Sequence, residues 1–266
     1  MRAYDAHFVL VGQPNGQRPA TTAALLATLL AAVVLLQLSL NGPMAVETRV
    51  PPGSSSSIEK ANATSSMPVG QSERWGFGDP VVLVGDSLTE FSFEPKWFGF
   101  GLRLQAYFSR RNDVLNRGSQ GITSQQLLSQ YNDILTASVA AHQSPAAITI
   151  WVGTNDIINE ISVENYVKNL KEMVKATQIK HPSTKIVIIT PPPVSDESFA
   201  RALRSYRDAA LQLAKEAKLT ALDTWQTFLG PNARWDKSVD KYFYDGVHFN
   251  SLGHDVFFKA IKTLLP

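Results

Sequence analysis

The chain of 266 residues contains no cysteine and carries little net charge. The absence of cysteine excludes a disulfide scaffold, a thiolate metal site and a cysteine nucleophile. A formal net charge of +2, without any basic run, gives no signal for a nucleic-acid partner. The sequence also lacks a phosphate-cradling Gly-Lys-Ser/Thr loop and a convincing His/Asp/Glu metal spacing. We therefore expect neither a cofactor nor a metal ion.

A long uncharged apolar run occupies residues 23–40. As a helix it would span about 27 Å, close to the roughly 30 Å of a bilayer core. No polar face interrupts the run, which argues against a helix buried in a globular core. We predict a short tail over 1–19 and a transmembrane signal anchor over 20–41, with a cleaved signal peptide as the alternative.

Residues 42–75 are rich in proline and serine and poor in aromatic residues. Such a segment cannot form a core, so we predict a flexible linker. Arg2 and Arg18 precede the apolar run and give a weak positive bias on its amino-terminal side. This bias favours a single-pass protein with its carboxy-terminal bulk luminal or extracellular. Cleavage of a signal peptide would instead release a secreted protein.

From residue 76 onward, apolar runs alternate with amphipathic patterns. The apolar runs predict strands at 80–85, 113–116, 146–153, 185–190 and 220–225. The amphipathic patterns predict helices over 97–110, 123–141, 163–180, 195–217 and 251–265. Continuous apolar strands separated by helices are typical of a parallel sheet that is covered on both faces. We predict a three-layer α/β/α sandwich with a central parallel sheet over 76–266.

Polar residues cluster in four loops, three of them directly after predicted strands. These loops contain Gly85-Asp86-Ser87, Asn116-Arg117-Gly118, Gly153-Thr154-Asn155-Asp156 and Asp245-Gly246-Val247-His248. Each loop alone has an ordinary explanation as a helix cap, a turn or a solvated ion pair. Ligands of parallel sheets bind at the carboxyl ends of the strands, so we expect the four loops to converge there.

Together the loops supply every group that acyl transfer by a serine requires. Such a reaction needs a nucleophile, a base, an acid that orients the base, and donors for the developing oxyanion. Ser87 can be the nucleophile, His248 the base and Asp245 the orienting acid. Gly118 can offer a backbone N–H and Asn155 a side-chain amide. We interpret the remaining acids of these loops, Asp86 and Asp156, as structural.

The four loops resemble the four conserved blocks of the GDSL (SGNH) hydrolases, over roughly 75–266. Within that superfamily the chain most resembles the isoamyl acetate-hydrolysing esterases, through "GDSLTEFSF", "DVLNRG", "TPPPV", "LDTW" and "DGVHFNSLGH". The resemblance implies a flavodoxin-like sandwich and a triad of Ser87, Asp245 and His248. It also implies an oxyanion hole formed by the Ser87 amide, Gly118 and Asn155.

The resemblance further implies a serine esterase that hydrolyses small, short-chain acyl esters through an acyl-enzyme. The residues after Gly118, Ser119-Gln120-Gly121, depart from the family pattern, which leaves the substrate open. The alternatives are a lysophospholipase or thioesterase, a carbohydrate O-acetylesterase, and an acyltransferase. A non-catalytic binding domain on the same scaffold is the alternative from another class. Aromatic residues beside the Ser87 and Asp245 loops could line an apolar substrate pocket.

Overall fold

The computed structural model describes residues 78–139 and 143–266. The predicted anchor over 20–41 and the predicted linker over 42–75 lie outside these residues. In the described part of the chain, none of the helices is both long and apolar enough to cross a membrane.

A single sheet of five parallel strands forms the centre of the described part of the chain, in the order β2-β1-β3-β4-β5. The strands are β1 (Gly78–Gly85), β2 (Asn112–Gly118), β3 (Ala147–Trp151), β4 (Lys185–Ile189) and β5 (Thr220–Leu222). The predicted parallel sheet is therefore confirmed. The strand order reverses between β1 and β3, and in sheets of this type ligands bind at such a reversal, beyond the carboxyl ends of the strands.

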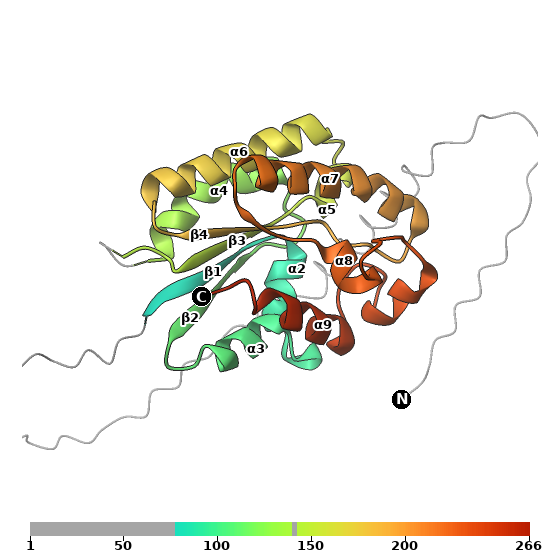
Figure 1. Cartoon of the computed structure of the whole chain (residues 1–266), viewed down its shortest axis with the longest axis horizontal. Helices are drawn as coiled ribbons and strands as arrows, with labels where there is room; N and C mark the ends of the chain where they lie inside the picture. Colours follow the sequence, from blue (N-terminus) through green and yellow to red (C-terminus); the bar gives the residue numbers. More distant parts are fainter. Residues whose placement is uncertain (1–77, 140–142) are drawn as a thin grey trace, which may run out of the picture. The chain divides into compact units, whose positions relative to one another are not determined.

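Helices cover both faces of the sheet (Figure 1). Helices α4, α6 and α7 lie on one face, and α3 and α9 lie on the other. The α-helices of the described residues are α2 (Ser87–Glu90), α3 (Phe100–Tyr107), α4 (Ser124–Ala137), α5 (Thr154–Ile158), α6 (Val163–Lys180), α7 (Glu197–Glu216), α8 (Thr224–Leu229) and α9 (Ser251–Ile261). Three short 3₁₀ helices join them, η1 (Phe91–Phe93), η2 (Pro95–Trp97) and η3 (Lys237–Tyr242). The three-layer arrangement agrees with the prediction.

Alternate residues of each strand enter two separate hydrophobic cores. Val81 and Leu83 pack with α3 and α9, whereas Val82 and Val84 pack with α4, α6 and α7. Side chains of a strand point alternately to the two faces, so both faces of β1 are buried. This explains why the strands read as continuous apolar runs rather than as alternating patterns.

Several observed elements are shorter than the predicted ones, and three short helices were not predicted. The strand predicted over 220–225 stops at Leu222, because Asp223 caps α8 and accepts hydrogen bonds from the amides of Trp225 (3.0 Å) and Gln226 (3.4 Å). The helix predicted over 97–110 begins only at Phe100. Helices α2, α5 and α8 were not predicted, since four to six residues are too few to show a helical period.

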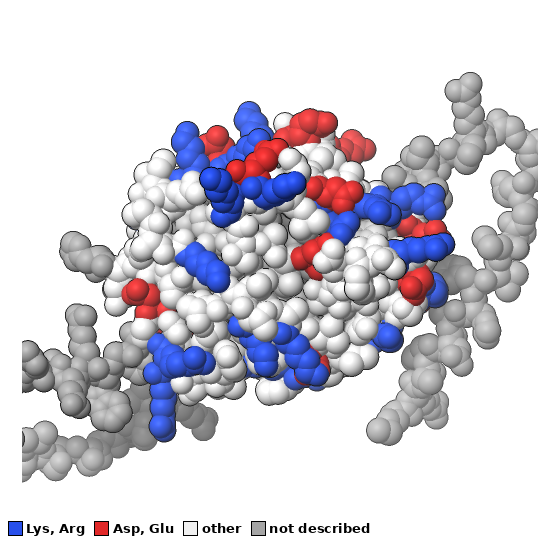
Figure 2. All heavy atoms as spheres, viewed as in Figure 1, with Lys and Arg blue, Asp and Glu red and all other residues white. Residues whose placement is uncertain are grey.

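Charged side chains of both signs are interspersed on the face shown in Figure 2. Over α6 and α7, Lys and Arg alternate with Asp and Glu. On that face, neither sign forms a continuous patch over these two helices.

Candidate active site

The carboxyl ends of the first three strands lie at the same level of the sheet. Gly85 at the end of β1 pairs with Gly118 of β2 and with Trp151 of β3. A Cβ atom on Gly85 would lie 2.2 Å from the Trp151 carbonyl oxygen, and one on Gly118 would lie 2.1 Å from the Glu90 nitrogen. Glycine at both positions therefore lets the three strand ends and α2 approach closely.

Ser87 is the first residue of α2, directly after the β1 glycine and Asp86. Asp86 caps this helix, and its Oδ1 accepts a hydrogen bond from the Leu88 amide at 3.0 Å. Asp86 therefore has the structural role predicted for it. The amide of a first helical residue has no acceptor within its own helix, so the Ser87 N–H is available to a ligand.

Asp86 is fully buried, and burial raises the pKa of its carboxyl to about 7. The Leu88 hydrogen bond and the charge of His248 act against this rise. Its Oδ2 has no hydrogen-bond partner among the described residues. Protonation of the Asp86 Oδ2 removes a buried negative charge that has no hydrogen-bond donor beside it.

His248 lies between Ser87 and Asp245. Its Nε2 is 2.9 Å from the Ser87 Oγ, and its Nδ1 is 2.6 Å from the Asp245 Oδ2. The other carboxylate oxygen of Asp245 accepts from the His248 amide at 2.7 Å and from the Val247 amide at 3.0 Å. The contacts fit an imidazole that donates from Nδ1 to Asp245 and accepts the Ser87 hydroxyl proton at Nε2, a tautomer assigned from its partners.

The environment of Asp245 keeps its carboxylate ionised. Partial burial acts to raise its pKa, but the hydrogen bond to His248 and the charge of that ring prevail and lower it. An ionised Asp245 can both orient the imidazole and stabilise the imidazolium that forms when Ser87 loses its proton.

The loop that carries Asp245 and His248 is closed at its base. Phe243 and Phe249 form an antiparallel bridge, and the Tyr244 amide donates to the His248 carbonyl at 3.0 Å. Asn250 follows as the cap of α9. The backbone on both sides of His248 is thus held by hydrogen bonds, which positions its ring.

The three predicted oxyanion donors differ in their availability. The Asn155 Nδ2 donates to the Ile122 carbonyl at 3.0 Å, which leaves one amide hydrogen for a substrate. The Gly118 amide donates to the Asn116 Oδ1 at 2.9 Å. Gly118 must share or release this bond before it can serve an oxyanion.

Sequence reasoning missed this contact of Asn116. An asparagine two residues before a glycine is the available signal, because its side chain can reach the backbone N–H two residues on. That signal is common in turns and does not by itself indicate a functional role.

The model of the GDSL-like lipase/acylhydrolase family matches residues 83–256, a range that contains Ser87, Gly118, Asn155, Asp245 and His248. The chain belongs to this family. Its members named below are esterases or lipases, and the protein is a carboxylic ester hydrolase.

Curated relatives place the chain near a particular group of GDSL hydrolases. It is 28% identical over 207 residues to an isoamyl acetate-hydrolyzing esterase 1 homolog of Rattus norvegicus, covering 70% of this chain and 80% of the relative. It is 27% identical over 211 residues to a GDSL esterase/lipase of Arabidopsis thaliana, covering 70% and 85% of the two chains. The resemblance stated from the sequence is confirmed.

Solved structures of other hydrolases share the fold. An acetylxylan esterase from Geobacillus stearothermophilus matches with a TM-score of 0.56 and 21% identity, over 71% of this chain and 94% of that chain. A lipase/acylhydrolase from Enterococcus faecalis matches with the same TM-score and identity, over 71% and 98%. At 21% identity, this structural similarity supports the fold of the GDSL hydrolase but not a particular substrate.

In this GDSL hydrolase, Asp156 of α5 holds the first residue of α4. Its Oδ2 accepts from the Ser124 amide at 2.9 Å, and its Oδ1 accepts from the Ser124 hydroxyl. The Asn169 amide in turn donates to the Ser124 hydroxyl at 2.8 Å. The start of α4 is thereby fixed to α5, next to Asn155, in keeping with a structural role for Asp156.

Some of the aromatic residues near Ser87 and Asp245 are buried in the hydrophobic core, and others contact the side chains of the site. Phe243 and Phe100, the first residue of α3, are buried in the hydrophobic core on the side of the sheet covered by α3 and α9. Phe91 instead contacts His248 edge-on, with ring centroids 5.0 Å apart. Among the residues that the structure describes, no group of three or more His, Cys, Asp or Glu side chains could hold a metal ion.

Proposed function

We propose that this ester hydrolase is a serine esterase that cleaves small, short-chain acyl esters through an acyl-enzyme on Ser87. One observation carries the proposal. His248 lies within hydrogen-bond distance of both Ser87 and Asp245, at 2.9 Å and 2.6 Å. This is the geometry in which a histidine can take a proton from a serine while a carboxylate orients it.

In the acylation step the Ser87 Oγ attacks the ester carbonyl carbon, and its proton passes to the His248 Nε2. The carbonyl electron pair moves onto the oxygen and forms a tetrahedral oxyanion. When this pair returns, the bond to the alcohol oxygen breaks and His248 gives its proton to the departing alkoxide. The products are the free alcohol and an acyl ester on Ser87.

Deacylation repeats these steps with water. His248 takes a proton from the water, whose oxygen attacks the acyl carbon, and then returns a proton to the Ser87 oxygen as the carboxylic acid leaves. We assign the oxyanion to the Ser87 amide and the free hydrogen of the Asn155 amide, with Gly118 joining if Asn116 yields its bond. Such donors stabilise the transition state more than the ground state.

One further observation supports short acyl chains. The relatives include proteins whose names specify hydrolysis of isoamyl acetate, an ester with a two-carbon acyl group. Phe91 borders His248 directly and makes this margin of the site apolar, which suits an ester without charge but does not select its acyl length.

A turnover panel tests both parts of the proposal. Esters of one alcohol, graded from acetate to palmitate, are compared with an acetylated sugar and a lysophospholipid, using the wild-type protein and Ser87→Ala. We expect acetate to hexanoate esters to react fastest and Ser87→Ala to remove nearly all turnover, with an unchanged thermal melt. Faster turnover of palmitoyl esters or lysophospholipids by tenfold or more would overturn the short-chain proposal. A folded Ser87→Ala protein with near wild-type activity would overturn the serine mechanism.

We also propose membrane attachment through residues 20–41, on the basis of the sequence alone. The full-length chain is expected to stay in the membrane fraction after a carbonate wash, whereas a chain beginning near Ser72 should be soluble and active. Release of the full-length protein by carbonate would contradict this.

A further inference from the structure

An exposed turn follows β2 at the catalytic edge of the sheet. Residues 119–122 form this turn, which we call the β2 turn, and a hydrogen bond from the Ile122 amide to the Ser119 carbonyl closes it at 3.3 Å. Gly121 is its third residue and has a φ of +75°, the conformation that a type II turn requires at this position. The first three residues are exposed, so the position of the turn depends mainly on hydrogen bonds.

The two ends of the β2 turn are tied to the neighbouring strand ends. At its start, the Ser119 amide donates to the carbonyl of Gly85, the last residue of β1, at 3.0 Å. At its end, the Ile122 carbonyl accepts from the Asn155 Nδ2 at 3.0 Å. Asn155 belongs to α5, which follows β3, and its second amide hydrogen is the proposed oxyanion donor. The orientation of this amide therefore depends on where the turn places the Ile122 carbonyl.

Glu90, the last residue of α2, holds the middle of the β2 turn. Its carboxylate accepts a hydrogen bond from the Gln120 amide. Its backbone is fixed on both sides, since its amide donates to the Asp86 carbonyl at 2.9 Å and its carbonyl accepts from the Asn116 Nδ2 at 2.8 Å. Because Asp86 directly precedes Ser87, the carboxylate reaches the turn from a backbone that is fixed relative to the nucleophile.

The Glu90 carboxylate is suited to this task. Hydrogen bonds to an ionised acceptor are stronger than neutral ones, which matters for an exposed amide that water could also bind. No salt bridge within the described residues involves Glu90. Turns of types I and II differ by a rotation of the central peptide group, which here joins Gln120 to Gly121. Without the carboxylate this peptide group is freer to rotate, and a rotation would shift the Ile122 carbonyl.

We propose that Glu90 is a positioning residue of the esterase, which acts through the β2 turn on the Asn155 amide. This inference rests on the proposed acyl-enzyme reaction of Ser87. It gives an exposed carboxylate outside the triad control over the orientation of an oxyanion donor. Since such a donor acts mainly in the transition state, loss of Glu90 should affect kcat and leave KM nearly unchanged.

The test measures whether Glu90 and Asn155 act as one unit. The kcat and KM for an acetate ester are determined with the full-length wild type, Glu90→Ala, Glu90→Gln, Asn155→Ala and the double variant Glu90→Ala/Asn155→Ala. Two residues that act through each other show non-additive effects in such a cycle, whereas independent residues show additive ones. Thermal melts establish that each variant is folded.

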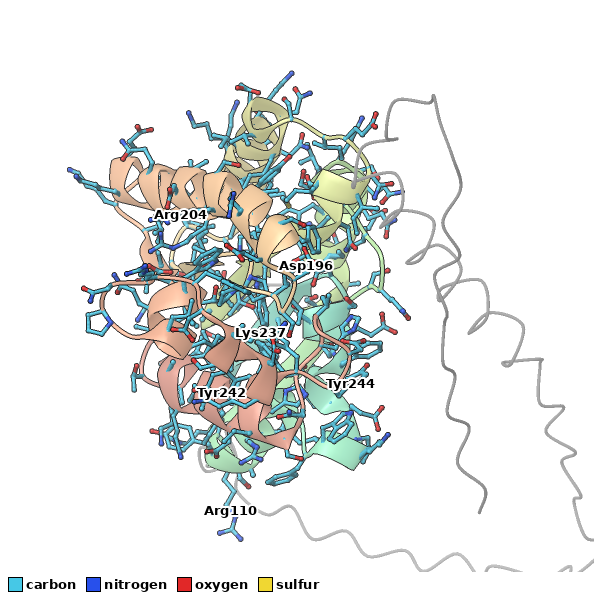
Figure 3. All side chains as sticks on the ribbon, turned by 90° about the vertical axis from the view of Figure 1, so that its right-hand side faces the viewer. Arg110, Asp196, Arg204, Lys237, Tyr242 and Tyr244 are labelled. Atoms are coloured by element: carbon cyan, nitrogen blue, oxygen red, sulfur yellow. The ribbon has the colours of Figure 1, made fainter. Side chains whose placement is uncertain are left out.

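Glu216→Ala is the matched control. Glu216 is also an exposed glutamate, and its carboxylate accepts a hydrogen bond from a glutamine side chain one turn earlier at 2.8 Å. It is the last residue of α7. Figure 3 shows that α7 leads from its cap Asp196 toward Arg204 and away from Tyr244, which lies in the loop of the catalytic histidine. This variant therefore removes the same type of side chain at a distance from the site.

We expect Glu90→Ala to lower kcat about 3- to 10-fold and to change KM by less than about twofold, because the loss of one hydrogen bond has an effect of this size. Glu90→Gln should restore most of kcat, since its amide oxygen can still accept from the Gln120 amide. In the Asn155→Ala background, Glu90→Ala should change kcat by less than about twofold, because the donor through which it acts is absent. Glu216→Ala should leave kcat and KM unchanged.

Three results would overturn the proposal. An equal loss of kcat from Glu90→Ala with and without Asn155 would show that Glu90 does not act through this amide. A rise in KM without a fall in kcat would assign Glu90 to substrate binding. A wild-type kcat in Glu90→Ala would show that the turn keeps its place without the carboxylate. A wild-type protein that hydrolyses no ester would refute the proposed function itself, which is a distinct outcome.

Discussion

At the residue scale, the side-chain amide of Asn155 contacts a loop and is also the proposed oxyanion donor. Its Nδ2 donates one hydrogen to the Ile122 carbonyl. We expect Asn155→Ala to lower kcat by about 10²–10³-fold, or about 3–4 kcal/mol, with little change in KM, because an oxyanion donor acts mainly in the transition state. Steady-state kinetics with Asn165→Ala, an exposed asparagine of α6, as control will measure this. An equal rise in KM without a fall in kcat would assign Asn155 to ground-state binding.

Gly118 allows a second prediction at this scale. A Cβ atom there would lie 2.1 Å from the Glu90 nitrogen, and backbone cannot move aside as a flexible side chain can. We expect Gly118→Ala to lower the free energy of unfolding by at least about 1–3 kcal/mol, the usual cost of overpacking. Gly121→Ala is the comparison, since its Cβ would meet open space and the cost there comes from its φ of +75° rather than from a clash. Denaturant titrations that show Gly118→Ala to be the milder change would contradict the close approach.

The sequence predicted that Ser87, His248 and Asp245 lie together, and the structure brings these side chains within hydrogen-bond distance. The sequence did not predict the contacts made by the residues around them. Ser, His and Asp at predicted strand ends limit the chemistry, because few residue types can fill those roles. The engagement of Gly118 by Asn116, and the stacking of Tyr244 on His248, depend on side-chain rotamers. Rotamers are decided by tertiary packing, which no local pattern encodes.

At the scale of elements, one buried ion pair joins α7 to the start of α8. The Arg207 Nε donates to the Asp223 Oδ1 at 2.9 Å, and its NH2 group donates to the other carboxylate oxygen. Hydrogen bonds to Asp223 raise the pKa of Arg207 despite its burial. Asp223 is also the cap of α8, so this pair fixes where β5 ends and α8 begins.

We expect Arg207→Met to lower the free energy of unfolding by about 3–5 kcal/mol, because it leaves a partly buried carboxylate without its counter-charge. Arg201→Met is the matched control on the same helix. Arg201 pairs with Glu197 at 2.9 Å, but both side chains are exposed, and such pairs contribute at most about 1 kcal/mol. Equal effects of the two substitutions on urea unfolding would refute the distinction.

The long elements could be predicted from the sequence, and the short ones could not. Helix α6 begins and ends at the predicted residues, since its apolar pattern repeats over 18 residues. Helix α5 has five residues, and a cluster of Gly, Thr, Asn and Asp gave it the pattern of a turn. Asp156 in this helix accepts a hydrogen bond from the Ser124 amide, a tertiary contact that no local pattern indicates.

At the scale of the whole molecule, buried His254 couples stability to pH. It is 2% exposed, and burial, with a smaller effect of the Arg103 charge, lowers its pKa from 6.5 to about 4. Between these values the unfolded chain binds a proton that the folded protein does not. The contribution is therefore fully present above about pH 6.5 and is lost as the pH falls to about 4, for a total of about 3 kcal/mol.

His254→Gln tests this, because its amide oxygen can still accept from the Phe100 amide as the His254 Nδ1 does. We expect the variant to lose about 3 kcal/mol less than the wild type when the pH is lowered from 7 to 4, measured by denaturant unfolding. Asp86 acts in the opposite direction, since its raised pKa gives stability below pH 4 that is lost as the pH rises through about 7. The comparison between the two proteins, rather than the wild-type slope, isolates His254. Parallel pH profiles would show that His254 does not titrate in this way.

The topology followed from the sequence because the alternation of strands and helices leaves few choices. Right-handed crossovers and buried strands give a covered parallel sheet, and its carboxyl edge then collects the polar loops. The alternation does not specify the order of the five strands in the sheet, because strand neighbours depend on contacts between residues far apart in the sequence.

The packing of Trp151 on Phe257 gives the protein an internal optical reporter. The two rings are stacked 4.5 Å apart at an angle of 3°, and Trp151 is buried at the end of β3 while Phe257 belongs to α9. A tryptophan fixed in such asymmetric surroundings contributes to near-ultraviolet circular dichroism, which disappears when the packing loosens. The chain has five tryptophans, so the part due to Trp151 is the difference between the wild-type and Trp151→Phe spectra. Because α9 directly follows the loop of His248, this difference reports in solution, without any substrate or label, whether α9 is packed against the end of β3.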